Sequence, residues 1–153
     1  MKRKAFGKTS DGQSVEMVTL SNSNGCEASF ITYGASLVTL TMPDHKGKFA
    51  DIVLGFKTPE EYKRNPYFIG GTIGRYGNRI AKGRFRLNGK DIILQRNNGE
   101  NHLHGGARGY FAVHWNVKEN SSAEGDGLTF NYLSADGEEG YPGALRSLSC
   151  QAG

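Results

Sequence analysis

The chain has 153 residues, of which 37% are hydrophobic, and a formal net charge of +4 at pH 7. This is the length of one ordinary domain, and 22 glycines with 8 phenylalanines and 7 tyrosines, against 4 prolines, favour short strands with many turns. No apolar run is long enough to span a membrane, and the first residues have no hydrophobic signal segment. Cys26 and Cys150 lie far apart in sequence and do not form a disulfide framework. The sequence therefore predicts a cytoplasmic protein without a membrane partner.

The basic residues raise the question of nucleic acid. Lys2, Arg3 and Lys4 are expected to form a solvated tail, while the basic residues of segment 75–86 alternate with apolar ones as the faces of a strand do. This segment does not reproduce the aromatic RNA-reading strand of RNA-recognition domains, and the chain has no helix-turn-helix or zinc-finger spacing. The sequence therefore predicts no nucleic-acid partner.

Strands are expected where β-branched and aromatic residues gather between turn residues. In the first part of the chain these stretches are residues 15–20, 28–33, 36–42 and 50–54, with turn chemistry at residues 43–47. A short helix is expected next, because Thr58 can cap it, Pro59 suits its first position, and Asn65-Pro66 ends it within about two turns.

A hairpin over residues 84–94 is the clearest local prediction. Asn88-Gly89 lies between two alternating stretches and suits a type I′ turn, which needs positive φ at both central positions. Beyond it, strands are expected at residues 111–118 and 128–133, and loops at 97–109 and 135–143. The pattern predicts an antiparallel all-β domain whose loops carry the polar chemistry.

Several clusters allow a functional and a structural interpretation. His102 and His104 would share one face of a strand, with His114 a few residues on, but no cysteine or suitably spaced carboxylate completes a metal site. The G-x-x-G-x-x-G spacing of residues 71–77 differs from the dinucleotide fingerprint. The sequence therefore predicts neither a metal nor a cofactor.

Two further sets of polar residues remain open. Glu138-Glu139 would be a catalytic pair only if adjacent carboxylates could converge, and a solvated turn is the preferred interpretation. Asn78, Arg79 and His104 offer an amide, a guanidinium fork and an imidazole, a set that suits a polyhydroxylated ligand but also suits structural roles.

Four motifs carry a resemblance to a known family: DIVLGF, IGRYGNRIAKGRF, NHLHGG and DGEEGYPG, which begin at Asp51, Ile73, Asn101 and Asp136. In this order and at these intervals, from about Phe6 to Gly143, the chain resembles the aldose 1-epimerase (mutarotase) family. The resemblance implies a large antiparallel β-sandwich, the galactose mutarotase-like supersandwich, with a sugar lying across one sheet.

The same resemblance implies an isomerase of carbohydrate metabolism. It would interconvert the α and β anomers of hexoses such as glucose or galactose by acid/base ring opening, without a metal or cofactor. Asn78 and Arg79 match the sugar-contacting pair, and His104 matches the histidine that bonds the sugar near its reacting end. His102 matches no site residue.

The resemblance also predicts what the chain lacks. Residues 1–143 correspond to the N-terminal half of the family domain, and 144–153 depart from its pattern as an aberrant or truncated tail. The general acid and base belong to the other half, so no catalytic residue is assigned, and His104 is left as a candidate auxiliary group.

The chain is therefore expected to be an inactive fragment that self-associates through exposed sheet edges. Two alternatives remain. One is a non-catalytic carbohydrate-binding module. The other is a sugar-phosphate (glucose 6-phosphate) 1-epimerase, which Arg75 and Arg79 would suit.

Overall fold

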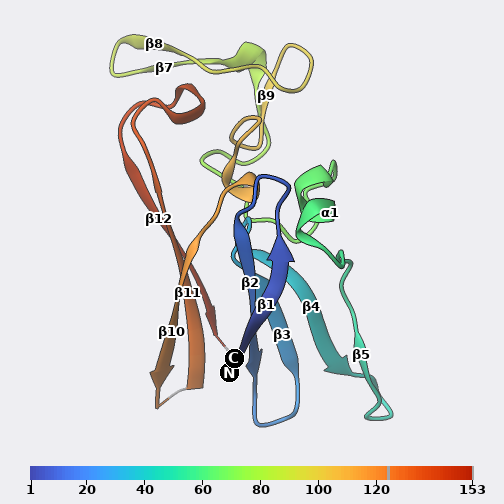
Figure 1. Ribbon diagram of the computed structural model, residues 1–153. Coiled ribbons are helices and arrows are strands. Elements are labelled where there is room, and N and C mark those ends of the chain that lie inside the picture. Colours follow the sequence, from blue (N-terminus) through green and yellow to red (C-terminus); the bar gives the residue numbers. More distant parts are fainter. Residues whose placement is uncertain (124, 153) are drawn as a thin grey trace.

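The computed structural model describes residues 1–123 and 125–152 (Figure 1). Five antiparallel strands form the first sheet in the order β1-β2-β3-β4-β5. Their bounds are Lys2–Lys8 for β1, Ser14–Ser21 for β2, Glu27–Ile31 for β3, Ser36–Pro43 for β4 and Phe49–Asp51 for β5.

A second sheet has three antiparallel strands in the order β10-β11-β12. These strands are Asn116–Ser122, Gly125–Ser134 and Leu145–Ala152, so β12 lies within the predicted tail and pairs with β11. Two short antiparallel pairs complete the strands: β6 (Arg79–Ile80) with β9 (His102–Leu103), and β7 (Arg84–Leu87) with β8 (Lys90–Ile93).

The helical segments are short. α1 spans Pro59–Arg64, and 3₁₀ turns span Ala81–Gly83, Tyr110–Ala112 and Glu138–Gly140. Among the described residues, no helix is long and apolar enough to cross a membrane. The structure confirms the predicted all-β antiparallel class.

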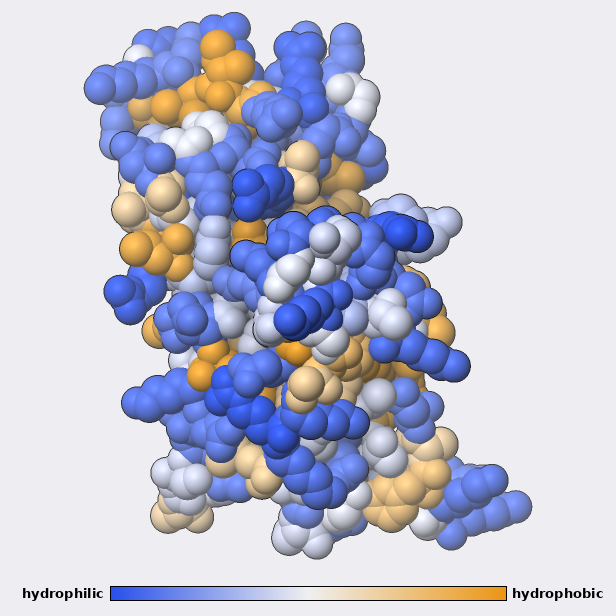
Figure 2. Space-filling view, viewed as in Figure 1, coloured by the Kyte–Doolittle hydropathy of each residue, from blue (hydrophilic) through white to orange (hydrophobic). Residues whose placement is uncertain are grey.

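The central strands of the first sheet are buried on both faces, while the outer surface in Figure 2 is mainly hydrophilic with scattered apolar patches. On one face, Val18, Leu20 and Phe30 pack with Leu128 and Phe130 of β11, and the Phe30 and Phe130 ring centroids lie 6.1 Å apart. This contact packs the two sheets against each other, as Figure 1 shows for β11 beside β2. Burial of these side chains is the main driving force for the packing.

The opposite face of the first sheet packs against α1. Val15, Met17, Ile31 and Val38 form a second buried cluster with Tyr62 of the helix. The alternation of Val15 and Met17 with Val18 and Leu20 follows from the two-residue period of a strand. It explains why apolar residues occur at both odd and even positions between Val15 and Leu20.

The N-terminal residues do not form a solvated tail, and this prediction was wrong. Lys2–Lys8 is an edge strand on β2, with Lys2 Nζ 3.2 Å from a Glu27 carboxylate oxygen and Arg3 Nη2 2.5 Å from one of Glu16. The basic side chains mark an exposed strand edge rather than a disordered segment. Lys2 and Arg3 pair with acids of β3 and β2 respectively.

The strand predicted at residues 50–54 ends early. β5 stops at Asp51, whose Oδ1 accepts the backbone N–H groups of Leu40 and Val53 and so interrupts the ladder. Ile52 and Leu54 are 62% and 75% exposed.

Two expectations for residues 97–118 were also inexact. The predicted loop contains β9, and the strand predicted from residue 111 begins only at Asn116. The 3₁₀ turn at Tyr110–Ala112 replaces its first residues, because the Tyr110 carbonyl accepts the Trp115 indole N–H at 3.0 Å.

The local turn and cap predictions are confirmed. Asn88 and Gly89 have φ of 50° and 78°, as a type I′ turn requires. Thr58 and Glu61 form a reciprocal capping box at the start of α1.

Candidate functional site

The pairing of β6 with β9 brings Asn78, Arg79 and His104 together. Arg79 lies opposite Leu103 in this two-residue ladder, so Asn78 and His104 meet just beyond its end. The Asn78 backbone N–H donates to His104 Nδ1 at 2.9 Å, and the His104 N–H donates to the Asn78 carbonyl at 3.1 Å. The three residues predicted from the sequence are thus neighbours.

The two hydrogen bonds fix how the His104 ring is used. A backbone N–H can only donate, so Nδ1 is an acceptor and the neutral ring carries its proton on Nε2. Asn78 and His104 have φ of 65° and 53°, which is left-handed backbone that ends each short strand. His104 therefore offers an Nε2–H donor from a turn rather than from a strand face.

Phe68 holds the His104 ring from the side. The two rings meet edge to face with centroids 4.8 Å apart, and Phe68 also contacts Phe111 at 4.6 Å. Such contacts restrict the orientation of the imidazole. Sequence reasoning missed Phe68, whose only local signal is an aromatic residue two positions before Gly70-Gly71.

The Arg79 guanidinium forms only some of its possible hydrogen bonds within the protein. Its Nε donates to Asn98 Oδ1 at 2.9 Å and its Nη1 approaches Asn78 Oδ1 at 3.4 Å. Nη2 has no acceptor among the described residues, and the side chain is exposed. Arg79 can therefore donate to a ligand that lies beside His104.

His102 has an interior role instead. It is fully buried, its Nδ1 donates to the Gln95 carbonyl at 2.6 Å, and its Nε2 accepts the Tyr141 hydroxyl at 2.8 Å. Both ring nitrogens are occupied, so His102 and His104 do not form the chelating pair considered from the sequence. No group of three metal-ligating side chains gathers in the part of the chain that the structure describes.

The Arg75 guanidinium is saturated by the protein. Its five N–H groups face the Ser134 hydroxyl and the carbonyl oxygens of Ser134, Ala135, Pro142 and Gly143 at 2.6–3.3 Å. It also lies over the Tyr141 ring, 5.7 Å from the centroid. Arg75 ties the 135–143 loop to the centre of the molecule and has no donor left for a phosphate.

Glu138-Glu139 lies in a turn as predicted, but its side chains are not simply solvated. Glu138 accepts the hydroxyl groups of Tyr132 and Ser134, and Glu139 accepts the backbone amides of residues 107–108 at 3.1 and 2.9 Å. Burial, followed by the bond to Glu138, raises the pKa of Tyr132 to about 12. Each carboxylate is half-buried and holds a different part of the structure, so the two do not converge as a catalytic pair.

Solved structures share this arrangement of packed antiparallel sheets. The aldose epimerase homologue of C. elegans has a TM-score of 0.80 and 32% identity over 89% of this chain and 41% of that one. The galactose 1-epimerase of Lactobacillus acidophilus has a TM-score of 0.82 and 26% identity over 97% of this chain and 43% of that one. The chain is therefore an antiparallel β protein of the galactose mutarotase-like fold.

The sequence comparisons name the family. The family model described as aldose 1-epimerase matches residues 16–148, and the chain belongs to this family. It is 42% identical to the galactose mutarotase of Sus scrofa over 146 residues, which are 94% of this chain and 41% of that protein. It is 34% identical to the aldose 1-epimerase of Escherichia coli K12 over 135 residues, which are 88% of this chain and 38% of that protein. The chain thus spans about two fifths of the length of these relatives.

Proposed function

We propose that this chain supplies the sugar-holding part of an aldose 1-epimerase that interconverts the α and β anomers of a hexose such as galactose or glucose. The supporting observation is the pair of hydrogen bonds between Asn78 and His104, which leaves the His104 Nε2–H as a donor. Arg79 follows Asn78 in sequence and pairs with Leu103, and its Nη2 has no acceptor among the described residues. A sugar ring presents several oxygens within a few ångströms. Donors grouped in this way suit it.

The reaction needs two proton transfers. A base removes the proton of the C1 hydroxyl while an acid protonates the ring oxygen, the bond from C1 to the ring oxygen breaks, and an open-chain aldehyde forms. Rotation about the C1–C2 bond and reversal of these steps close the ring with the other configuration. In this scheme His104 donates from Nε2 to an oxygen near C1, and Arg79 donates to a hydroxyl further along the ring.

We assign a positioning role, rather than proton exchange, to Asn78, Arg79 and His104. The family's general acid and base have no match in these residues. Glu138 and Glu139 are committed to internal hydrogen bonds, Glu139 with the backbone of residues 107–108 just after NHLHGG and Glu138 with the hydroxyls of Tyr132 and Ser134. This internal use also favours the second candidate, a module that binds carbohydrate without changing it.

A third candidate is a sugar-phosphate epimerase, but only one of the two arginines considered for binding the phosphate remains available. Every N–H group of Arg75 has a partner within the chain, which leaves Arg79 alone to meet a phosphate. We therefore favour a neutral hexose for the site.

Calorimetric titration with D-galactose and D-glucose tests the proposed site. Arg79→Ala should weaken binding by about tenfold or more and His104→Ala by a few-fold, because a hydrogen bond from a charged group contributes about 1.5–3 kcal/mol and a neutral one about 0.5–1.5 kcal/mol. His45→Ala and Arg86→Ala are matched controls, since both side chains are exposed and no bond of either is described. Absence of saturable binding, or equal losses in the controls, would contradict the assignment.

We also propose that copies of the chain associate through β12. This strand is an edge of its sheet, and Leu145 and Leu148 on it are 45% and 62% exposed. An open edge with apolar side chains favours pairing with another chain. Sedimentation should show a smaller assembly for Leu148→Lys than for the unchanged chain, and identical profiles would count against this contact.

A further inference from the structure

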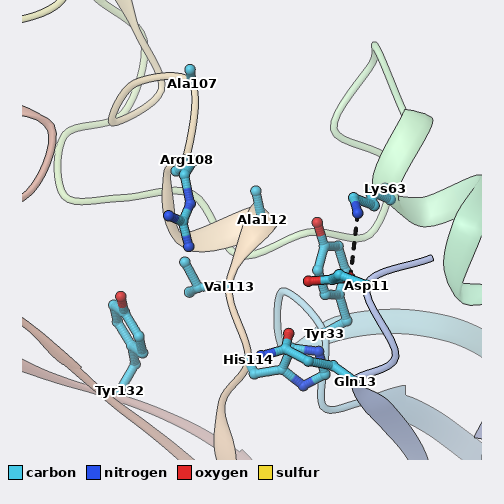
Figure 3. Close-up of a pocket in the computed structure, with 10 residues that line it drawn as sticks. All are labelled: Asp11, Gln13, Tyr33, Lys63, Ala107, Arg108, Ala112, Val113, His114 and Tyr132. Atoms are coloured by element: carbon cyan, nitrogen blue, oxygen red, sulfur yellow. Dashed lines mark hydrogen bonds and ion pairs between the residues drawn. The ribbon is translucent and has the colours of Figure 1, made fainter. Parts of the chain in front are cut away.

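A cavity separate from the candidate sugar site lies among the β1–β2 connection, α1 and the segment that leads into β10. Its volume is about 620 Å³, within the usual range for small-molecule pockets. Neither Asn78, Arg79 nor His104 lines it. Figure 3 shows its walls, with Tyr33, Asp11 and Lys63 on one side and Arg108 and Tyr132 on the other.

Two polar groups in the wall of this cavity have no hydrogen-bond partner within the described part of the chain. Tyr33 is only 6% exposed, and its hydroxyl forms no hydrogen bond with any described residue. His114 packs its ring edge against Tyr33 with centroids 5.5 Å apart, and its Nε2 is buried without a partner. Buried polar groups are almost always hydrogen-bonded, and His114 Nε2 is the buried side-chain atom without a partner among the described residues. Together with the neighbouring Tyr33 hydroxyl it gives this wall two polar atoms that a ligand could bond.

Both groups are held neutral. Burial raises the pKa of Tyr33 and lowers the pKa of His114, in each case because the charged form is poorly solvated there. Tyr33 therefore presents a neutral hydroxyl, which can donate to or accept from a ligand hydroxyl.

The charged residues around the cavity favour an anion. Lys63 Nζ lies 3.4 Å from Asp11 Oδ1 and also donates to the Ser10 hydroxyl, so this cation is already paired. The Arg108 side chain is exposed, and its guanidinium has no acceptor among the described residues. Among the residues that line this cavity, Lys63 and Arg108 face the single carboxylate of Asp11, while Glu138 and Glu139 lie with Arg108 in the adjoining pocket. Because Arg108 forms no ion pair within the described residues, its guanidinium is the cation that remains available to an anion.

We propose that this cavity binds a small hydroxylated anion, with its carboxylate or phosphate against Arg108 and a hydroxyl against Tyr33. Ala107, Ala112 and Val113 give short apolar walls between these polar groups and leave room for a carbon chain or ring. A sugar acid and a sugar phosphate both have this chemistry. The proposal concerns a different surface from the hexose site and does not depend on it.

Calorimetric titration of the whole chain with gluconate and, separately, with glucose 6-phosphate tests the proposal. Arg108→Gln should weaken the binding of the anion by about tenfold or more, since it removes a charge-assisted hydrogen bond. Tyr33→Phe keeps the ring against His114 and removes only the hydroxyl, so a loss of about two- to tenfold is expected. Arg86→Gln is the matched control for charge, because it removes an exposed arginine elsewhere on the chain.

The pattern of binding distinguishes the two sources of the anion. Binding of gluconate alone identifies a carboxylate ligand, and binding of glucose 6-phosphate alone identifies a phosphate ligand. His104→Ala should not change the affinity for gluconate, whose open chain lacks the hexose ring that the other site is proposed to hold. The proposal is overturned if neither anion binds, if Arg108→Gln and Arg86→Gln have equal effects, or if His104→Ala abolishes the binding of gluconate.

Discussion

His102 Nε2 and Tyr141 Oη lie 2.8 Å apart in the interior and join two motifs that are 39 residues apart in sequence. Because His102 Nδ1 faces the Gln95 carbonyl, which can only accept, Nδ1 carries the ring proton and Tyr141 donates to Nε2. Arg75 covers the Tyr141 ring and also ties down the loop that carries it. The buried hydrogen bond between Tyr141 and His102 thus helps to position the NHLHGG segment, which also carries His104.

Tyr141→Phe should destabilise the chain by about 1–3 kcal/mol, because it leaves a fully buried imidazole nitrogen without its donor. Urea denaturation measures this loss. Tyr67→Phe is the control, since Tyr67 is 79% exposed, and it should change the free energy of unfolding very little. Equal stability of the two variants would show that the bond to His102 contributes nothing.

Phe68→Leu should weaken hexose binding without removing any group that bonds the sugar. The substitution keeps an apolar side chain but loses the edge-to-face contact with the His104 ring. Contacts of this kind contribute about 0.5–1.5 kcal/mol. A two- to tenfold loss of affinity is expected, together with a shift in the NMR signals of the His104 ring nitrogens. Unchanged nitrogen signals would mean that Phe68 does not orient this ring.

Features set by neighbouring residues were predictable from the sequence. The Asn88-Gly89 turn and the Thr58 cap depend on backbone conformations that a few residues determine, and the structure has both. The family motifs also indicated Asn78 and Arg79, which the β6–β9 pairing brings beside His104.

Features set by distant partners were not predictable. Lys2–Lys8 is a strand only because β2 offers its edge, and nothing within the basic segment itself indicates this. The role of Arg75 depends on carbonyl groups about 60 residues further along the chain. The alternation of His102 and His104 suggested one shared face, but the positive φ of His104 turns its ring away from that pattern.

His114 should make stability depend on pH in the weakly acidic range. Burial lowers its pKa in the folded chain below the ordinary value of 6.5, although Asp11 acts in the opposite direction. The unfolded chain therefore binds more protons between these two pKa values, so this contribution to stability is complete above pH 6.5 and falls as the pH drops below it. Urea denaturation at pH 7.5, 6.5 and 5.5 should show a smaller acid loss for His114→Phe than for the unchanged chain. Parallel losses would contradict the assignment, and His45→Gln should leave the curve unchanged.

A polypeptide of these 153 residues should bind a hexose without accelerating the exchange of its anomers. Asn78, Arg79 and His104 are proposed only to hold the sugar, whereas proton transfer by one positioned group contributes about 10²–10⁴-fold, and no residue of this chain is assigned as the acid or the base. Polarimetry of freshly dissolved α-D-galactose or α-D-glucose at neutral pH measures the rate, with His104→Ala as the comparison. The expected rate for both proteins is that of a buffer with the same imidazole concentration. A large, saturable acceleration would contradict the prediction. If Glu138→Gln or Glu139→Gln then abolished it, that carboxylate would be the base despite its internal hydrogen bonds.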